Sequence, residues 1–165
     1  QSVARALALN PKLVIADEPT AGLDVSVQAE ILNLMTGLRR DLGLSFLVIT
    51  HNLAVVRHVT DRVAVLYLGR MAEWGPTREV FARPLPPYPR SLVAAEPQAD
   101  PRKRRADLAL QGEIPSALAR PSGCEFHTRC PLATPRCAAE EPQPRMITPG
   151  RMVRCHFAEE TKQQT

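Results

Sequence analysis

The sequence predicts an α/β domain, in which a parallel sheet is flanked by helices, followed by a small irregular extension that contains cysteines. Two observations predict the domain. Helical and strand patterns alternate over residues 1–82, and several apolar runs are unbroken, as in strands buried on both faces of a parallel sheet. A third observation predicts the extension, because the chain beyond residue 82 is interrupted by prolines and holds all four cysteines.

The composition is that of a chain with a moderate core. Of 165 residues 16 are proline, and the formal net charge of +4 permits an acidic partner, a membrane face or a nucleotide without requiring nucleic acid. No apolar run approaches the roughly 20 residues of a membrane helix, and the N-terminal QSVARALALNP is not a secretory signal. A chain that starts at Gln1, within a helical pattern, indicates a fragment of a longer protein.

The individual elements follow from apolar periodicity and from capping residues. Asp24 is placed to cap the longest helix and Gly43 to end it, and Asn52 is placed to cap the next helix. The expected helices span residues 2–9, 25–41, 53–59, 77–81 and 88–95. The expected strands span residues 13–16, 44–49, 62–68 and 71–75. A turn at residues 69–70 joins the last two strands as a hairpin.

Two adjacent carboxylates, Asp17 and Glu18, follow the first strand, and His51 follows the second. Ligands of open α/β sheets bind beyond the carboxyl ends of the strands, so these side chains are expected at one rim. Magnesium takes carboxylate oxygens, a second carboxylate can activate a water for attack on phosphorus, and an imidazole can donate to a phosphate oxygen. The plainer alternatives are an acidic helix cap and a surface or helix-capping histidine.

Three segments of residues 1–82 resemble the ATP-binding cassette (ABC) ATPases. LVIADEPTAGLD resembles the Walker B strand and D-loop, VITHN the strand with the switch histidine, and QSVARALALNP the helix after the signature motif. The resemblance implies the C-terminal half of an ABC-type P-loop ATPase domain that uses ATP and Mg²⁺. It implies that Asp17 holds Mg²⁺ through water and that Glu18 is the general base for hydrolysis. It further implies that His51 contacts the γ-phosphate and that Asp24 lies at the interface with a partner ATPase.

Several motifs of that family are absent from the sequence. These are the phosphate-binding G-x-x-x-x-G-K-[ST], the Gln loop and the LSGGQ signature. The D-loop reads Ala21-Gly22-Leu23-Asp24, where relatives usually have Ser-Ala before Leu-Asp. We therefore expect the C-terminal part of a longer protein, and we expect residues 1–165 alone to hydrolyse ATP negligibly.

The cysteines Cys124, Cys130, Cys137 and Cys155 stand among prolines and arginines, with little apolar material for a core. Two disulfides would cross-link a secreted protein, whereas an ATPase implies the cytosol, where a metal is favoured. Zinc knuckles usually pair cysteines at closer spacing, and the wider gaps fit four thiolates around an iron–sulfur cluster. Zinc, free thiols and disulfides remain alternatives.

Residues 84–157, with IPSALARPSGCEFHTRCPLATPRC and VRCHF, resemble the C-terminal extension of the ATP-binding subunits of oligopeptide and dipeptide importers. In some of these subunits the four cysteines hold a [4Fe-4S] cluster, and the resemblance implies such a cluster here, in a structural role. His127 and His156 stand beside ligand cysteines. Either could replace a ligand, but a position outside the ligand set or in solvent is favoured.

The expected organisation has four parts. They are a partial ATP-binding cassette domain at 1–82, a proline-rich connecting segment at 83–122, a four-cysteine metal- or cluster-binding extension at 123–157 and a tail at 158–165. The basic run at 102–105 is interpreted as a solvated linker, with contact to an anionic lipid surface or acidic partner as the alternative.

The two resemblances together imply the ATP-binding and ATP-hydrolysing subunit of an ABC importer of peptides. The implied partners are a second ATP-binding subunit, two transmembrane permease subunits and, indirectly, a peptide-binding protein. The implied location is peripheral, on the cytoplasmic face of the inner membrane. The rival hypotheses are an ABC ATPase that moves no solute and a metal-dependent nucleic-acid-binding module. The second rival lacks stacking aromatics near the cysteines apart from Phe126 and Phe157, so no nucleic acid is expected.

Overall fold

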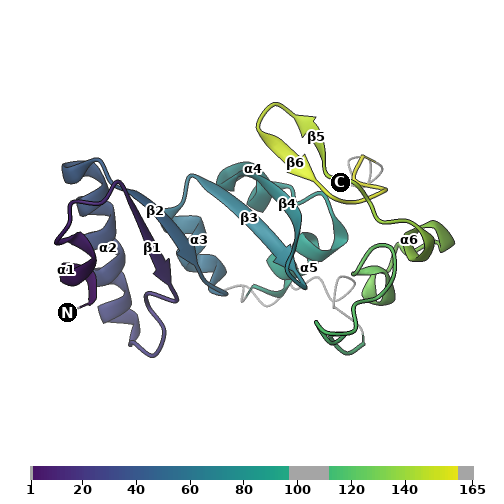
Figure 1. Ribbon diagram of the computed structural model, residues 1–165, viewed down its shortest axis with the longest axis horizontal. Helices are drawn as coiled ribbons and strands as arrows, with labels where there is room; N and C mark the ends of the chain where they lie inside the picture. Colours follow the sequence, from purple (N-terminus) through teal and green to yellow (C-terminus); the bar gives the residue numbers. More distant parts are fainter. Residues whose placement is uncertain (1, 97–111, 160–165) are drawn as a thin grey trace, which may run out of the picture. The chain divides into compact units, whose positions relative to one another are not determined.

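The computed structural model describes residues 2–96 and 112–159 of the chain. It contains two compact units, residues 1–59 and residues 60–165 (Figure 1). The basic run at 102–105 and residues 160–165 of the tail lie outside the described residues. Among the described helices, none combines the length and the apolar character that crossing a membrane requires.

The first unit alternates helices and strands in the predicted order. Its elements are α1 (Ser2–Leu7), β1 (Leu13–Asp17), α2 (Val25–Leu42), β2 (Ser45–Ile49) and α3 (Leu53–Val59). The strands β1 and β2 pair in parallel, from Leu13 opposite Ser45 to Asp17 opposite Ile49. This register brings the carboxyl ends of the two strands side by side, as the sequence predicts.

Local capping interactions fix where the helices of this unit begin and end. The Asp24 side chain accepts a hydrogen bond of 2.9 Å from the backbone N–H of Val27 and caps α2. Gly43 ends α2 with φ +63°, the left-handed conformation that glycine adopts without a steric penalty. The Asn52 side chain accepts from the N–H of Ala54 at 3.0 Å and caps α3. All three predicted capping positions are therefore confirmed.

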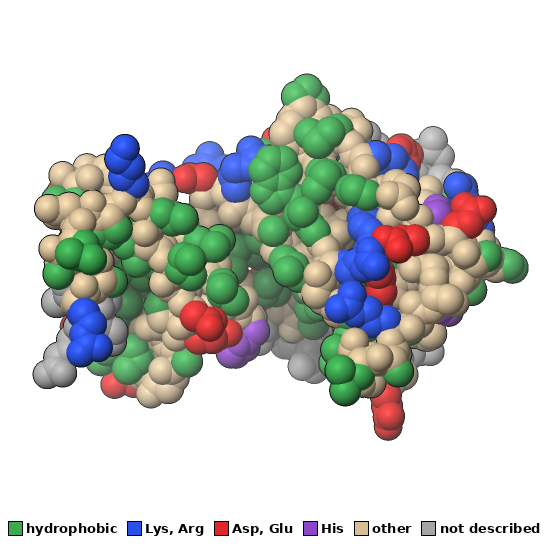
Figure 2. Space-filling model, in the orientation of Figure 1, with side chains coloured by type: hydrophobic (Ala, Val, Ile, Leu, Met, Phe, Trp, Pro, Cys, Tyr) green, Lys and Arg blue, Asp and Glu red, His purple; other side chains and the backbone are tan. Residues whose placement is uncertain are grey.

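The sheet of the first unit is covered on one face only. Its core consists of Leu32, Met35 and Val55 from α2 and α3, packed against the inward side chains of β1 and β2. On the opposite face of the two strands, four apolar side chains are 50–63% exposed to solvent. They are Leu13, Ile15, Leu47 and Ile49. Figure 2 shows hydrophobic side chains gathered over these strands. The prediction of strands buried on both faces is wrong for the described unit, because its helices supply a core to one face only.

The second unit is built on an antiparallel sheet. Its elements are β3 (Arg62–Tyr67), β4 (Arg70–Pro76), α4 (Thr77–Ala82), α5 (Pro87–Ala95), the 3-10 turn η3 (His127–Arg129), α6 (Pro135–Ala139), β5 (Arg145–Thr148) and β6 (Arg151–Val153). The strand order is β3-β4-β6-β5, and every neighbouring pair is antiparallel. The predicted hairpin is confirmed as β3 and β4, with a register shift between Val65 and Leu66.

The cysteine-containing extension packs onto this hairpin. β6 pairs with β4 through Glu73 opposite Val153 and Trp74 opposite Met152. The buried side chains Leu85, Val153 and Ala158 form a small core. The hairpin at 62–76, which the sequence assigns to the cassette domain, thus lies in one compact unit with the extension. The functional boundaries expected at residues 82, 122 and 157 remain predictions.

A buried ion pair joins β4 to β6. The Glu73 side chain is fully buried and its Oε1 lies 2.6 Å from a guanidinium nitrogen of Arg151, which is 7% exposed. The other Glu73 oxygen accepts the backbone N–H of Leu85 at 3.2 Å, and Arg151 donates to the carbonyl of Arg83. Burial raises the pKa of Glu73, and the hydrogen bond from Arg151 opposes that rise. The pair therefore connects the extension to the segment between α4 and α5.

Candidate functional site

The first candidate site lies where β1 and β2 end together. Asp17 is the last residue of β1 and pairs with Ile49, the last residue of β2. The backbone N–H of Glu18 donates to the carbonyl of Ile49 at 2.8 Å, so the pairing continues one residue beyond the strand. Glu18 therefore meets Thr50 and His51 directly, because these residues follow β2 as Glu18 follows β1.

Both oxygens of the Glu18 carboxylate accept hydrogen bonds. Oε1 accepts the backbone N–H of His51 at 3.0 Å and lies 2.7 Å from Nδ1 of the same residue. A carboxylate can only accept, so Nδ1 carries the proton in this contact. Oε2 accepts the hydroxyl of Thr50 at 3.0 Å. The side-chain bond from His51, and then the bonds from Thr50 and the His51 backbone, lower the pKa of Glu18.

The backbone of Glu18 is in an uncommon conformation. Its φ is +44°, in the left-handed region that a residue with a Cβ rarely adopts. Such a residue persists only when its surroundings hold it, and such residues cluster at functional sites. The bonds from the Glu18 N–H to Ile49 and from Thr50 and His51 to its carboxylate supply that constraint.

The other two acidic residues of the predicted site occupy different positions. Asp17 is exposed at the end of β1, next to Glu18. Asp24 is exposed and uses one carboxylate oxygen to cap α2. The structure thus brings Glu18 and His51 into contact and sets Asp17 beside them, while the functional roles assigned to all four residues remain predictions. The sequence reasoning did not single out Thr50, although its position directly before His51 was a signal.

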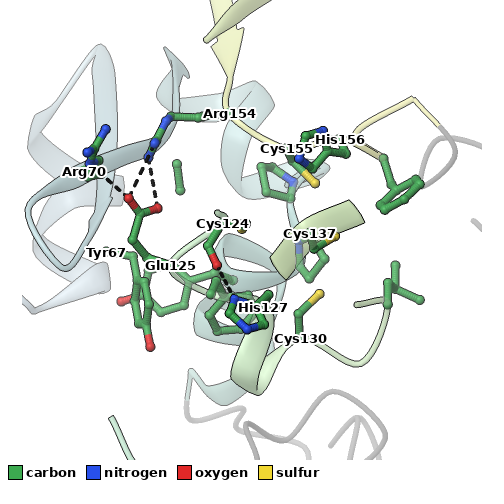
Figure 3. A pocket seen from close by; sticks show the side chains of 17 residues that line it. Tyr67, Arg70, Cys124, Glu125, His127, Cys130, Cys137, Arg154, Cys155 and His156 are labelled. Carbon is green, nitrogen blue, oxygen red and sulfur yellow. Dashed lines mark hydrogen bonds and ion pairs between the residues drawn. The ribbon is translucent and has the colours of Figure 1, made fainter. Parts of the chain in front are cut away.

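The second candidate site is a pocket in the second unit that all four cysteines line (Figure 3). None of the four forms a disulfide. Cys124 precedes η3, Cys130 follows it, Cys137 is in α6 and Cys155 follows β6. The Cys124 N–H donates to the Cys137 carbonyl at 2.8 Å, which joins the first cysteine loop to α6. Four thiols whose successive spacings in the sequence are 6, 7 and 18 positions therefore line one pocket.

Aromatic and charged side chains complete the walls of this pocket. The rings of Tyr67, Tyr88 and Phe126 are in mutual contact, with centroids 4.7–5.3 Å apart. The buried carboxylate of Glu125 lies 2.9 Å from Arg70 and 3.1 Å from Arg154 (Figure 3). The sequence reasoning missed these charges, because nothing in the local pattern distinguishes them from surface residues. They connect the loop of Cys124 to β4 and to the end of β6.

The two histidines next to the cysteines bond to backbone carbonyls. Nδ1 of His127 lies 2.9 Å from the carbonyl oxygen of Cys124. Nε2 of His156 lies 3.0 Å from the carbonyl oxygen of Glu140, at the end of α6. Each ring therefore uses one nitrogen to hold a segment that carries a cysteine. The other nitrogen of each ring is not used in these bonds, so the interpretation that neither histidine replaces a cysteine ligand remains a prediction.

Burial in the pocket favours the protonated form of three of the cysteine thiols. Burial raises the pKa of Cys124, and it raises the pKa values of Cys130 and Cys155 to about 11. Over residues 2–96 and 112–159, no group of three or more His, Cys, Asp or Glu side chains is arranged to hold a single metal ion. A metal or cluster would have to displace the thiol protons on binding, since thiolates are the ligands.

Thiol reactivity provides the first test. In chain prepared without metal or cluster, we expect iodoacetamide at pH 8 to modify Cys130 and Cys155 on the order of 100-fold more slowly than an unperturbed thiol. The cause is the low thiolate fraction at a pKa of about 11. The rate should rise about tenfold per pH unit up to that pKa. Mass spectrometry of timed digests measures it, with the urea-unfolded chain as the control. Equal modification rates in the folded and unfolded chains would contradict the burial of Cys130 and Cys155 in the pocket.

Gly123 is expected to be essential for the contact between the cysteine loop and α6. Its φ is +63°, and a Cβ there would lie 2.4 Å from the Cys137 carbonyl oxygen and 2.8 Å from the Ala138 backbone. Gly123→Ala should therefore push the loop away and lower the free energy of unfolding by about 1–3 kcal/mol. Gly150→Ala is the matched control, because its φ is +79° but only the flexible end of Arg62 lies nearby. Fluorescence of the single tryptophan, Trp74, measures unfolding, and equal losses for the two variants would exclude the steric effect.

The paired strand ends, with a carboxylate and a histidine in contact beyond them, are the arrangement expected of an ABC-type ATPase domain. Residues 72–137 match the profile of the family described as "Oligopeptide/dipeptide transporter, C-terminal region". The chain is 52% identical over 154 residues to "Probable peptide ABC transporter ATP-binding protein y4tS" of Sinorhizobium fredii, across 93% of this chain and 44% of that protein. It is 48% identical over 159 residues to "Di/tripeptide transport ATP-binding protein DppF" of Pseudomonas aeruginosa, across 96% of this chain and 49% of that protein.

The chain belongs to the oligopeptide/dipeptide family of ABC transporter ATP-binding proteins, and it matches their C-terminal part. It spans about half the length of the curated relatives it matches. A solved structure of CbiO1 from Clostridium perfringens, described as part of the ABC transporter complex CbiONQ, is 38% identical with a TM-score of 0.47, over 49% of this chain and 32% of that one. Neither rival hypothesis, an ATPase that moves no solute or a nucleic-acid module, finds support in these relatives.

Proposed function

We propose that this chain is the C-terminal part of a subunit that binds and hydrolyses ATP to energise an ABC importer of peptides. The observation that carries the proposal is the contact of Glu18 with His51, 2.7 Å apart at the adjoining ends of β1 and β2. The printed names of the relatives supply the substrate class, since they are peptide and di/tripeptide transport proteins.

In this function Glu18 is the general base. A carboxylate fixed at the end of a strand can take a proton from the water that attacks the terminal phosphorus of ATP. Nδ1 of His51 faces Glu18, so its Nε2 is the nitrogen with which it would contact the γ-phosphate. The contact thus holds the base and the imidazole in a fixed relation to each other before nucleotide binds.

The acidic residues around Glu18 fit a hard cation. Asp17 is an exposed carboxylate beside the base, and magnesium is commonly held by one or two carboxylates together with waters and substrate phosphates. Asp17 would hold Mg²⁺ through water, and the ion would neutralise phosphate charge during hydrolysis. Asp24, at the start of α2, would lie at the interface with the partner ATPase.

The transport role implies a larger assembly. The partners are a second ATP-binding subunit and two transmembrane permease subunits, and a peptide-binding protein acts indirectly. ATP binding and hydrolysis at the paired ATPase subunits would drive the permeases between inward and outward states. The protein would then be a peripheral subunit on the cytoplasmic face of the inner membrane.

The experiment that tests the function is ATP hydrolysis by the full-length subunit assembled with its permeases. We expect turnover that requires Mg²⁺ and increases when a peptide-loaded binding protein is added. The absence of Mg²⁺-dependent turnover in an assembled complex would contradict the proposal. Mg²⁺-dependent turnover that no peptide stimulates would support ATP hydrolysis by the subunit but would contradict the proposal that the transported substrate is a peptide.

We propose further that Cys124, Cys130, Cys137 and Cys155 hold a [4Fe-4S] cluster with a structural role. Four thiols lining one pocket provide the donor set that such a cluster takes. Zinc is the alternative, but it requires its ligands at about 2.3 Å from one centre, and the described residues present no single-ion group. Anaerobically purified protein should contain about four iron and four acid-labile sulfide per chain. Stoichiometric zinc without iron would support the alternative.

A further inference from the structure

The hydroxyl of Thr50 has both of its hydrogen-bonding roles occupied at the end of β2. It donates to Oε2 of Glu18 at 3.0 Å, and it accepts the backbone N–H of Asn52 at 3.1 Å. Because Asn52 caps α3, the hydroxyl joins the start of α3 to the carboxylate that follows β1. A hydroxyl has a single proton, so accepting from Asn52 directs that proton toward Glu18.

This contact determines which way the Glu18 carboxylate faces. The His51 backbone and ring both contact Oε1. Without a donor to Oε2, the carboxylate group could still turn while it keeps these two contacts. Thr50 is the donor that the described residues place on Oε2. With both oxygens held, the carboxylate has one orientation, although its backbone has the unfavourable φ of +44°.

We propose that Thr50 is a positioning residue for ATP hydrolysis. Its hydroxyl fixes the orientation of the Glu18 carboxylate through the hydrogen bond to Oε2. The inference rests on the proposed function, in which Glu18 is the general base. Thr50 itself contacts neither nucleotide nor attacking water in this account. Its effect is on the geometry of proton transfer, which is sensitive to small displacements of the base.

The test is a kinetic comparison in the full-length subunit assembled with its permeases. Thr50→Val keeps the shape of the side chain and removes the hydroxyl, and it should lower kcat by about 10- to 100-fold, the effect expected for a lost hydrogen bond to a charged group. The KM for ATP should stay within about twofold, since the bond contributes to orientation of the base and not to nucleotide binding. Thr50→Ser restores the hydroxyl and should restore kcat.

A double-variant comparison separates this role from a structural one. Combined with Glu18→Gln, Thr50→Val should cause less than about a twofold further loss, because no base remains to be oriented. An unchanged kcat in Thr50→Val, or an equal loss in both backgrounds, would overturn the inference. Thermal unfolding of the 165-residue chain with Thr50→Val and with Thr50→Ser shows whether the valine variant is folded. If Glu18→Gln alone leaves turnover intact, then the assignment of the base fails instead.

Discussion

Glu18→Gln is expected to reduce ATP turnover by the full-length subunit by roughly 10²- to 10⁴-fold, the range that general acid–base catalysis contributes. Glutamine has nearly the same shape, and its single carbonyl oxygen can still accept the bonds from the His51 backbone and ring, whose distances are 3.0 and 2.7 Å, while its amide nitrogen replaces the oxygen that Thr50 contacts. An amide cannot take a proton from the attacking water, so the chemical step is lost while the site remains in place.

The same variant should bind ATP with an affinity within a few-fold of the wild type. Phosphate release measures turnover, and equilibrium binding of ATP in the presence of Mg²⁺ measures affinity. Glu30→Gln is the matched control, because it makes the same change at an exposed position in α2. A loss of ATP binding equal to the loss of turnover would contradict the role of Glu18 as a base. So would wild-type turnover in Glu18→Gln.

The second large effect is expected at the buried ion pair of the second unit. Arg151→Met should lower the free energy of unfolding of that unit by about 3–5 kcal/mol, because it leaves an uncompensated carboxylate in the interior. Glu73 is fully buried, and its remaining partner is the backbone N–H of Leu85. The substitution also removes the hydrogen bond that Arg151 donates to the carbonyl of Arg83. We therefore expect the segment between α4 and α5 to be less firmly held as well.

Two comparisons establish the cause of that loss. Arg136→Met makes the same substitution in an exposed pair with Glu140, whose side chains are 58% and 60% exposed, and it should cost at most about 1 kcal/mol. Adding Glu73→Leu to Arg151→Met removes the unpaired charge and should recover much of the stability. Urea unfolding followed by Trp74 reports on this unit, because Trp74 lies in β4 opposite Met152. Equal losses for Arg151→Met and Arg136→Met would contradict the account.

Local interactions explain why most of the elements could be predicted from the sequence. The caps at Asp24, Gly43 and Asn52 depend on residues within three positions, so a short window contains the necessary information. The meeting of Glu18 with His51 could also be predicted, since parallel strands place their carboxyl ends at one edge. Every helix and strand expected before residue 96 is present, with its ends shifted by at most two residues.

Interactions between distant segments explain what could not be predicted. β6 pairs with β4 across some 80 positions of sequence, and β5 and β6 are too short to give a periodic signal. Glu73 and Arg151 resemble surface residues until that pairing buries them. The apolar runs of β1 and β2 predicted burial on both faces, but apolar character alone does not show which segment covers each face.

ATP-dependent uptake of peptide tests the central claim most directly. The full-length subunit would be reconstituted with its permeases in vesicles, with ATP and Mg²⁺ on the side of the ATPase and labelled peptide presented by the binding protein on the other. We predict that peptide accumulates only when ATP is present and that Glu18→Gln abolishes the accumulation. Accumulation without ATP, or ATP hydrolysis by the wild-type complex with no peptide movement, would contradict the account.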